Sequence, residues 1–531
     1  MHFAKTAARI ALGVMTILPV AGAWALTPAQ VNALEPTNII YISGSTELDA
    51  ALQAYAAADF FLAPGASFDG PLFEAGSYDI YKTATGYVLT GTAGLVGIQG
   101  LVNIAIVKQT LGGSAVGIHN VSAGIPVAGF PNLTNPAAFT ATCGTPVTTP
   151  ATGPFSTFNT YKCTLPESST IVPNAGISDE APTTWVGNGG VTAGDATALT
   201  TSNFADIPFA IIVNVALRNA LQAAEGLTSG SETLANVPYL TSTQTRAILS
   251  GQMSSLGDLY EFNPSTGKAT QIDPTGSFLH ICRHGDTSGS ELAANIYFFG
   301  RGCSKGSGVG GITAPDNVNT QAAGETWTGS AAQLSDLVFA GAGTNDVKNC
   351  VAAGTGSGDT FDARIGFVST AQTSQGTNWR YIGLNGIAPT IWNIQLDKYD
   401  WLMTGALFTS TNASLALNND SNTGMHSAIL RTLEILVPIE LITLNFPTQS
   451  SAASADNTGA SDTGLMTGNT QVLYGSDDPN GPSAPAWPIA IRGGSGSIPT
   501  AGQGPNNPQS QQYPSLQLNG CNAFYQADPF G

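Results

Sequence analysis

Short apolar runs alternate with longer amphipathic stretches through much of the chain. The apolar runs of strand length cover residues 38–42, 101–108, 209–213, 278–282 and 365–369. The stretches with helical length and composition cover residues 46–61, 215–224, 243–251 and 290–299. Strands that alternate with helices in this way predict α/β lobes built on mainly parallel sheets.

Three stretches interrupt this alternation. Residues 120–174 are rich in Pro and Thr, residues 302–359 in Gly, and residues 449–512 in Ser, Gly, Asn and Pro. Such composition predicts surface insertions or a tail that wraps the lobes.

The length of the chain is too great for one ordinary domain, so two lobes with insertions are expected. We predict a first lobe at 26–206 with an insertion at about 120–174, a second lobe at 207–369 with an insertion at about 302–359, a return to the first lobe at 370–448, and an extension at 449–531.

The N-terminus has the pattern of a secretory signal peptide. Lys5 and Arg9 give a positive start, residues 10–23 are apolar, and Ala23-Trp24-Ala25 is a small-x-small cleavage site. We expect cleavage after Ala25, which makes residues 1–25 a signal peptide and the mature protein periplasmic or secreted. Elsewhere no stretch reaches the ~20 apolar residues of a membrane helix, so no membrane insertion is expected.

The charge balance argues against large anionic partners. Removing Lys5 and Arg9 from the 17 Lys and Arg leaves 15 against 35 Asp and Glu, a net charge of −20. This excess of acids argues against nucleic acid or an anionic membrane as a partner. A small anion remains compatible with it, because a buried site depends on its local donors.

Six cysteines lie beyond the predicted cleavage site, at 143, 163, 282, 303, 350 and 521. An even number in an oxidising compartment predicts up to three disulfides. We expect Cys143 to pair with Cys163, because both lie in the same insertion, while the other pairings stay open. Neither a CxxC nor a Cys/His cluster has zinc spacing, so no metal and no cofactor are expected.

Small hydroxyl residues gather at three junctions, two of them opening onto predicted helices. The junctions are Ser43-Gly44-Ser45-Thr46, Gly112-Gly113-Ser114-Ala115 and the run 283–290, RHGDTSGS. A helix N-terminus offers unpaired N–H groups and a positive dipole end, and hydroxyls add donors, so these junctions predict a site for a tetrahedral anion. Arg283 would add a bidentate charged clamp. At any single junction the simpler interpretation is an N-cap.

Five segments in chain order resemble the phosphate-type substrate-binding proteins of ABC transporters. Residues 240–251 (LTSTQTRAILSG) with 256–259 (LGDL) resemble one family segment. Residues 207–211 (IPFAI) with Asn214, 365–369 (IGFVS), and 385–390 (NGIAPT) with Asn393 and Tyr399 resemble the others. The resemblance implies a two-lobed type II periplasmic-binding-protein fold, a monomer that captures phosphate or a similar oxyanion and delivers it to an ABC permease.

The same resemblance implies which residues bind the anion. The implied ligands are Ser45, Thr46, Ser114, Asp179, Arg283, Asp286, Ser288, Gly289 and Ser290. Asp179 would accept a hydrogen bond from a protonated oxyanion and so reject sulfate. The chain departs from the family pattern by one extra residue between Arg283 and Ser288, by Ser290 in place of Thr, and by Glu47 beside the first donor loop.

Two other classes compete with this interpretation. Residues 279–287 (LHICRHGDT) resemble the strand and loop of histidine phosphatases, in which His284 would be the nucleophile and His426 the second histidine. That motif normally opens its domain, whereas here it lies past the middle of the chain. The Ser/Gly/Thr-rich stretches would also suit an extracellular adhesive or matrix protein on the same scaffold. We therefore expect a binding protein and no enzyme.

Overall fold

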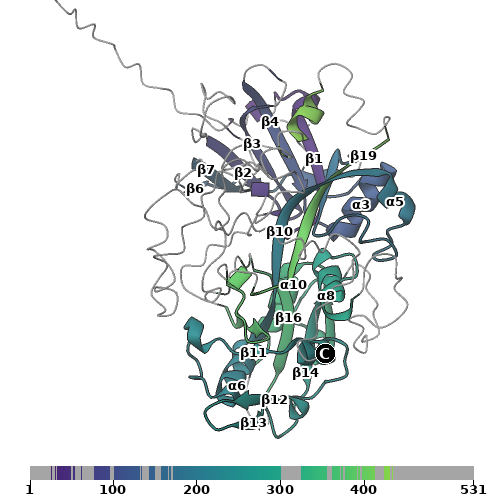
Figure 1. Ribbon diagram of the computed structural model, residues 1–531. Helices are drawn as coiled ribbons and strands as arrows, with labels where there is room; N and C mark the ends of the chain where they lie inside the picture. Colours follow the sequence, from purple (N-terminus) through teal and green to yellow (C-terminus); the bar gives the residue numbers. More distant parts are fainter. Residues whose placement is uncertain are drawn as a thin grey trace, which may run out of the picture.

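The computed structural model describes residues 26–433 with gaps, of which the longest are 54–60, 62–76, 134–142, 150–156, 301–323, 356–360 and 413–423. The described strands form two groups, one above the other, and two long strands run between them (Figure 1). We call the upper group with its helices the first lobe and the lower group with its helices the second lobe. The expected two-lobed α/β architecture is thus confirmed.

The first lobe is built around one mixed sheet. Its strands are β1 (Ile39–Gly44), β2 (Ser77–Lys82), β3 (Gly86–Gly94), β4 (Leu101–Gln109), β6 (Val147–Thr149), β7 (Thr157–Lys162) and β9 (Ala175–Ser178), with helices α3 (Gly113–Ala123) and α5 (Ala193–Thr197) and a small ladder of β5 (Phe130–Pro131) and β8 (Glu167–Ser168). Strand β1 lies parallel between β4 and β9, whereas β3 pairs antiparallel with both β2 and β4.

The second lobe is built around β14 (Leu279–His284), which pairs in parallel with two neighbours, β15 (Val338–Gly341) and β16 (Ala363–Ser369). Its helices are α6 (Val215–Glu225), α7 (Ser242–Leu249), α8 (Gly289–Phe299), α9 (Ala331–Ser335) and α10 (Thr344–Ala352). The short strands β11 (Tyr239–Leu240), β12 (Tyr260–Asn263), β13 (Lys268–Gln271), β17 (Trp379–Tyr381) and β18 (Gly383–Leu384) complete it.

Two strands connect the lobes. The first part of β10 (Leu199–Asn214) pairs antiparallel with β19 (Leu402–Ser410), and its second part pairs with β16. Strand β19 also pairs with β9, so the described strands from β15 to β6 form one continuous path of hydrogen-bonded neighbours. A register shift interrupts the β10–β19 ladder between Asn203 and Ala205.

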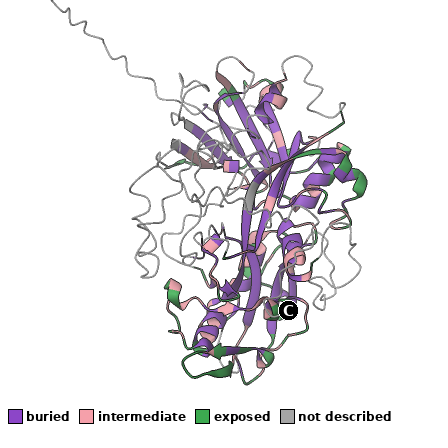
Figure 2. Cartoon of the chain, viewed as in Figure 1, coloured by how far each residue is buried: buried purple, intermediate pink, exposed green. Residues whose placement is uncertain are grey.

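Burial explains why the apolar runs became strands. Every residue of β16 is buried, as are four of the first five of β14, because helices and loops cover both faces of the second-lobe sheet. Figure 2 shows the same for both lobes, with exposed residues gathered on α5 and on the β12–β13 hairpin. Local chemistry sets the helix starts, as in α7, where Thr241 and Gln244 form a reciprocal capping box.

The structure also differs from the expectations. The sheets are mixed, since antiparallel ladders join β2, β3 and β4 and flank β10, so the prediction of mainly parallel sheets is wrong. The predicted helix at 46–61 falls largely outside the described residues, and Phe61 at its end instead bridges Ala93. The predicted insertion at 302–359 supplies β15 and α10 to the second lobe. The lobe boundaries as such stay a prediction.

Two disulfides join described cysteines. Cys143 bonds Cys163, which confirms that pairing, and Cys282 bonds Cys350. The remaining cysteines, Cys303 and Cys521, lie outside the described residues, as do the predicted signal peptide at 1–25 and the extension at 449–531. Within the described part of the chain, the helices are too short or too polar to cross a membrane.

Candidate functional site

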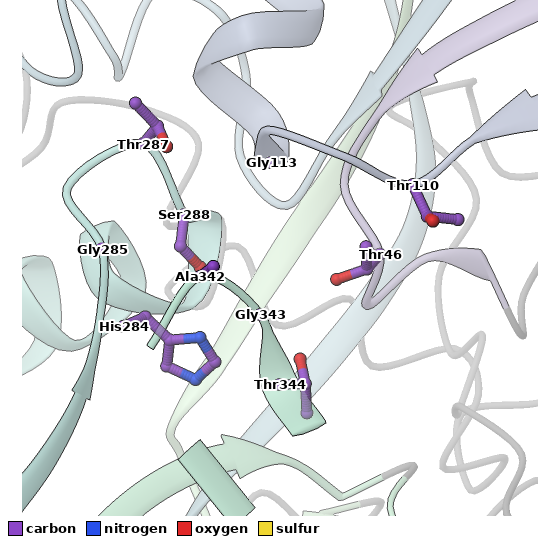
Figure 3. A pocket seen from close by; sticks show the side chains of 10 residues that line it. All are labelled: Thr46, Thr110, Gly113, His284, Gly285, Thr287, Ser288, Ala342, Gly343 and Thr344. Atoms are coloured by element: carbon purple, nitrogen blue, oxygen red, sulfur yellow. The ribbon is translucent and has the colours of Figure 1, made fainter. Parts of the chain in front are cut away.

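A pocket lies where four strands end. Strands β1, β4, β14 and β15 run toward it, and the loops at their carboxyl ends line it. Its lining residues are Thr46, Thr110, Gly113, His284, Gly285, Thr287, Ser288, Ala342, Gly343 and Thr344 (Figure 3). The space is about 310 Å³, counting the solvent at its mouth. Ligands of α/β sheets bind at the carboxyl ends of strands, so this is the expected place for a small molecule.

Three helices begin at this pocket. Gly113 is the first residue of α3, Ser288 is the N-cap of α8, and Gly343 is the N-cap of α10. The first N–H groups of each helix have no acceptor within the helix, and each N-terminus has a partial positive charge. Five hydroxyl side chains line the same space, those of Thr46, Thr110, Thr287, Ser288 and Thr344. The pocket is therefore rich in donors that suit an anion.

Glycine lets the two lobes approach closely here. Gly113 has a φ of +70°, and a Cβ on it would lie 2.7 Å from the backbone oxygen of Thr287. The backbone N–H of Ala115 donates to that same oxygen over 3.2 Å. Part of the donor capacity of α3 is thus already used by the second lobe.

Asp179 lies beside the pocket in a buried contact between the lobes. The hydroxyl of Ser45 donates to its carboxylate, and its backbone N–H donates to the Ser114 hydroxyl over 3.2 Å. A Cβ on Gly289 would meet Asp179 Oδ2 at 2.0 Å, so the carboxyl group packs directly on the start of α8. Burial, and secondarily the charge of Glu47, raise the pKa of Asp179 to about 8. This carboxyl group does not line the pocket.

Arg283 does not line the pocket. Its guanidinium donates to Asp286 and to the backbone oxygen of His284, and its Nε lies 3.3 Å from Glu291 Oε1. Burial raises the pKa of Glu291 to about 8, against the lowering effect of Arg283. Asp286 is more than half exposed. Arg283 and Asp286 therefore form a local cluster of charges and are not among the pocket-lining residues.

His284 lines the pocket, although the binding-protein interpretation gave it no role. Its Nε2 lies 3.0 Å from the backbone oxygen of Phe367, so this nitrogen donates and carries the proton. Burial lowers the pKa of His284, so the ring is neutral at pH 7. A neutral imidazole has one donor and one acceptor, which leaves Nδ1 as an acceptor.

The two histidines of the phosphatase interpretation lie apart. His426 Nε2 lies 2.9 Å from the backbone oxygen of Ile39, at the amino end of β1. The pocket lies beyond the carboxyl end of the same strand, which is roughly 16 Å away for a strand of this length. In addition, Nε2 of His284 is occupied by Phe367.

The nine predicted ligands thus divide into three groups. Thr46 and Ser288 line the pocket. Ser45, Ser114, Asp179, Gly289 and Ser290 are buried beside it. Arg283 and Asp286 pair with each other. The Ser290 hydroxyl, in the first turn of α8, is buried without a hydrogen-bond partner among the described residues.

Sequence reasoning missed one side of the pocket, the loop Ala342-Gly343-Thr344. The available signal was Gly343 followed three residues later by Asp346, whose carboxylate accepts from the Gly343 N–H. That helix-start pattern was hidden in a Gly-rich stretch. No group of three or more His, Cys, Asp or Glu in the described ranges is placed to hold a metal ion.

Comparison with known proteins gives similarity to solved structures alone. No family model matches the chain, and no curated protein matches it. The chain is similar to an ABC-type phosphate transport receptor from Vibrio cholerae (14% identity, 75% of this chain and 97% of that chain, TM-score 0.31). It is also similar to a putative phosphate ABC transporter substrate-binding protein with bound phosphate from Clostridium perfringens (13%, 75% and 96%, TM-score 0.35). A phosphate-binding protein from Stenotrophomonas maltophilia is a third (12%, 75% and 89%, TM-score 0.33).

Proposed function

We propose that this chain is an exported solute-binding protein that captures a tetrahedral oxyanion, phosphate first among them, between its two lobes for ABC-type uptake. The observation that carries the proposal is the convergence of α3, α8 and α10 on one pocket lined with hydroxyl groups. Helix N-termini and hydroxyls donate to an oxyanion without adding a counter-ion.

The charges around the pocket support a ligand held by neutral donors. Arg283 is paired with Asp286, and Lys108 is paired with Asp49 over 3.2 Å. Their charge is therefore already balanced by carboxylates within the protein. An oxyanion in the pocket would be bound chiefly by hydrogen bonds, which fix the shape and the protonation state of the ligand.

The proposal is tested by calorimetry with phosphate, sulfate and a carboxylate such as acetate. Ser288→Ala and Thr46→Val each remove one hydroxyl from the pocket lining, and circular dichroism checks that each variant is folded. A hydrogen bond to a charged group contributes about 1.5–3 kcal/mol, so each variant should bind the oxyanion roughly ten- to a hundredfold more weakly. Thr197→Val, an exposed threonine on α5, is the matched control.

Two results would overturn the proposal. Absence of binding to every oxyanion, in protein shown to be folded by circular dichroism, would favour the adhesive or matrix function. Turnover of p-nitrophenyl phosphate that is lost in His284→Ala would favour the phosphatase instead.

A further inference from the structure

Glu47 crosses from one lobe to the other. It follows the carboxyl end of β1 in the first lobe, and it is 3% exposed. Its two carboxylate oxygens accept hydrogen bonds from the hydroxyls of Thr344 and Ser369, and Gln372 Nε2 lies 3.5 Å from Oε2. Thr344 begins α10 and Ser369 ends β16, both in the second lobe, and Gln372 follows β16.

The hydrogen-bond donors around Glu47 are arranged to stabilise a buried anion. A buried carboxylate is costly unless hydrogen bonds satisfy it, and here both oxygens have donors. Gln372 is itself oriented by Lys348, whose Nζ donates to Gln372 Oε1 over 2.7 Å. The carboxylate also lies at the N-terminus of α10, where the helix dipole favours negative charge.

Thr344 connects this environment to the candidate ligand pocket. The residue lines the pocket, and its hydroxyl donates to Glu47. A threonine hydroxyl has a single proton to donate, so it cannot serve Glu47 and a ligand oxygen together. A ligand that takes this donor must therefore release Glu47 from one of its partners.

We propose that Glu47 is an internal anion that holds the two lobes together in the ligand-free protein and competes with a bound oxyanion for the Thr344 hydroxyl. The competition rests on the proposed function, whereas the connection between the lobes does not. Asp49, two residues further along, shows the contrast, because its carboxylate pairs with Lys108 inside the first lobe.

The connection between the lobes is tested by small-angle X-ray scattering of ligand-free protein. Glu47→Ala should have a larger radius of gyration than wild type, and Ser369→Ala should change it in the same direction by less. Glu232→Gln is the control, since it removes one charge at a partly exposed pair with Arg380 and should leave the radius unchanged. A radius in Glu47→Ala equal to that of wild type would refute the connection.

The competition is tested by calorimetry with inorganic phosphate. Glu47→Ala and Glu47→Met should bind phosphate at least about tenfold more tightly than wild type, because the competing carboxylate and its charge are gone. Equal or weaker binding would refute the competition. If Glu47→Ala does not fold, Glu47→Met decides both tests, because its side chain keeps the size of glutamate and has no carboxylate. Should neither wild type nor variants bind phosphate or sulfate, the proposed function fails, while the scattering result still decides the connection.

Discussion

Ser45 and Asp179, 134 residues apart in the chain, share a buried hydrogen bond at the ends of two neighbouring parallel strands. The serine hydroxyl donates to the carboxyl group, and the same hydroxyl accepts from the backbone N–H of Glu47 over 3.1 Å. Asp179 also packs on Gly289 of the second lobe. The protonation state of this one carboxyl group therefore affects both the first lobe and its contact with the second.

Stability should fall with rising pH through Asp179. Its pKa is raised from 3.8 to about 8, so the folded protein holds the proton more tightly than the unfolded chain. The stabilisation is complete below pH ~4 and is lost as the pH rises through about 8. Asp179→Asn stays neutral and is nearly isosteric. The fall in its melting temperature from pH 5 to pH 8.5 should therefore be smaller than the fall in wild type by at least about 2 °C.

Thermal unfolding followed by circular dichroism measures this difference. Glu291, whose pKa is also raised to about 8, remains in the variant and should preserve part of the slope. An identical slope in wild type and Asp179→Asn would show that Asp179 does not retain its proton in the folded protein.

Selectivity between phosphate and sulfate should depend on His284. Its Nδ1 is an acceptor next to the pocket, so it can pair with the O–H of hydrogen phosphate, and sulfate at neutral pH has no such proton. His284→Asn can turn an NH₂ group toward the ligand. The ratio of sulfate affinity to phosphate affinity, measured by calorimetry, should therefore rise by about tenfold or more. Asp179→Asn should leave the ratio unchanged. The reverse outcome would support the selectivity role that the sequence resemblance gave to Asp179.

Arg283 should matter for stability more than for affinity. Arg283→Ala removes a buried guanidinium that donates to Asp286 and to the backbone oxygen of His284, and losing a hydrogen bond of a charged group costs about 1.5–3 kcal/mol. Urea denaturation should show this loss. Unchanged stability together with a large loss of oxyanion affinity would instead identify Arg283 as the ligand clamp that the sequence predicted.

The disulfide Cys282–Cys350 should stabilise both the fold and the pocket. It connects β14 to α10 across 68 residues, compared with 20 for Cys143–Cys163. In the chain-entropy model these separations correspond to about 4 and about 3 kcal/mol. Replacing Cys282 and Cys350 by Ala should therefore lower the melting temperature more than replacing Cys143 and Cys163. It should also weaken phosphate binding, because α10 begins at Thr344, which lines the pocket. Equal phosphate affinity in the two double variants would contradict the second part.

Processing of the exported protein should expose Leu26. Mass spectrometry of the protein from the culture medium or periplasm should find Leu26 as the first residue, as the Ala23-Trp24-Ala25 pattern predicts. Material that still begins at Met1 in those fractions would refute the predicted cleavage.

The buried strands could be predicted because each is a continuous run of apolar residues, as in β16 and the second half of β10. Strand β15 was not, because Val338–Gly341 is four residues long and is buried through its pairing with β14, a contact distant in sequence. The residues of the pocket could likewise be predicted where the signal is local in sequence, and could not be where it depends on distant pairing. Hydroxyls before α8 are a local signal, whereas the loop after β15 depends on that long-range pairing.

The orientation of Arg283 and His284 could not be read from the sequence. Successive residues of a strand point to opposite faces, so only one of these neighbours can face the pocket. Which one does so is fixed by the register of β14 against β15 and β16. The sequence resemblance placed the arginine there, and the observed register places the histidine there.

The two strands that join the lobes mark the positions at which the gene could be divided to exchange the second lobe. Pro208 of β10 pairs with Leu402 of β19, and the N–H of Phe209 donates to the backbone oxygen of Trp401 over 3.0 Å. The chain therefore leaves the first lobe and returns to it at one point. In genetic terms, residues 209–401 are a cassette between two paired antiparallel strands. Replacing that cassette by a short turn would leave a β-hairpin, so a different second lobe could be inserted there without changing the connections of the first.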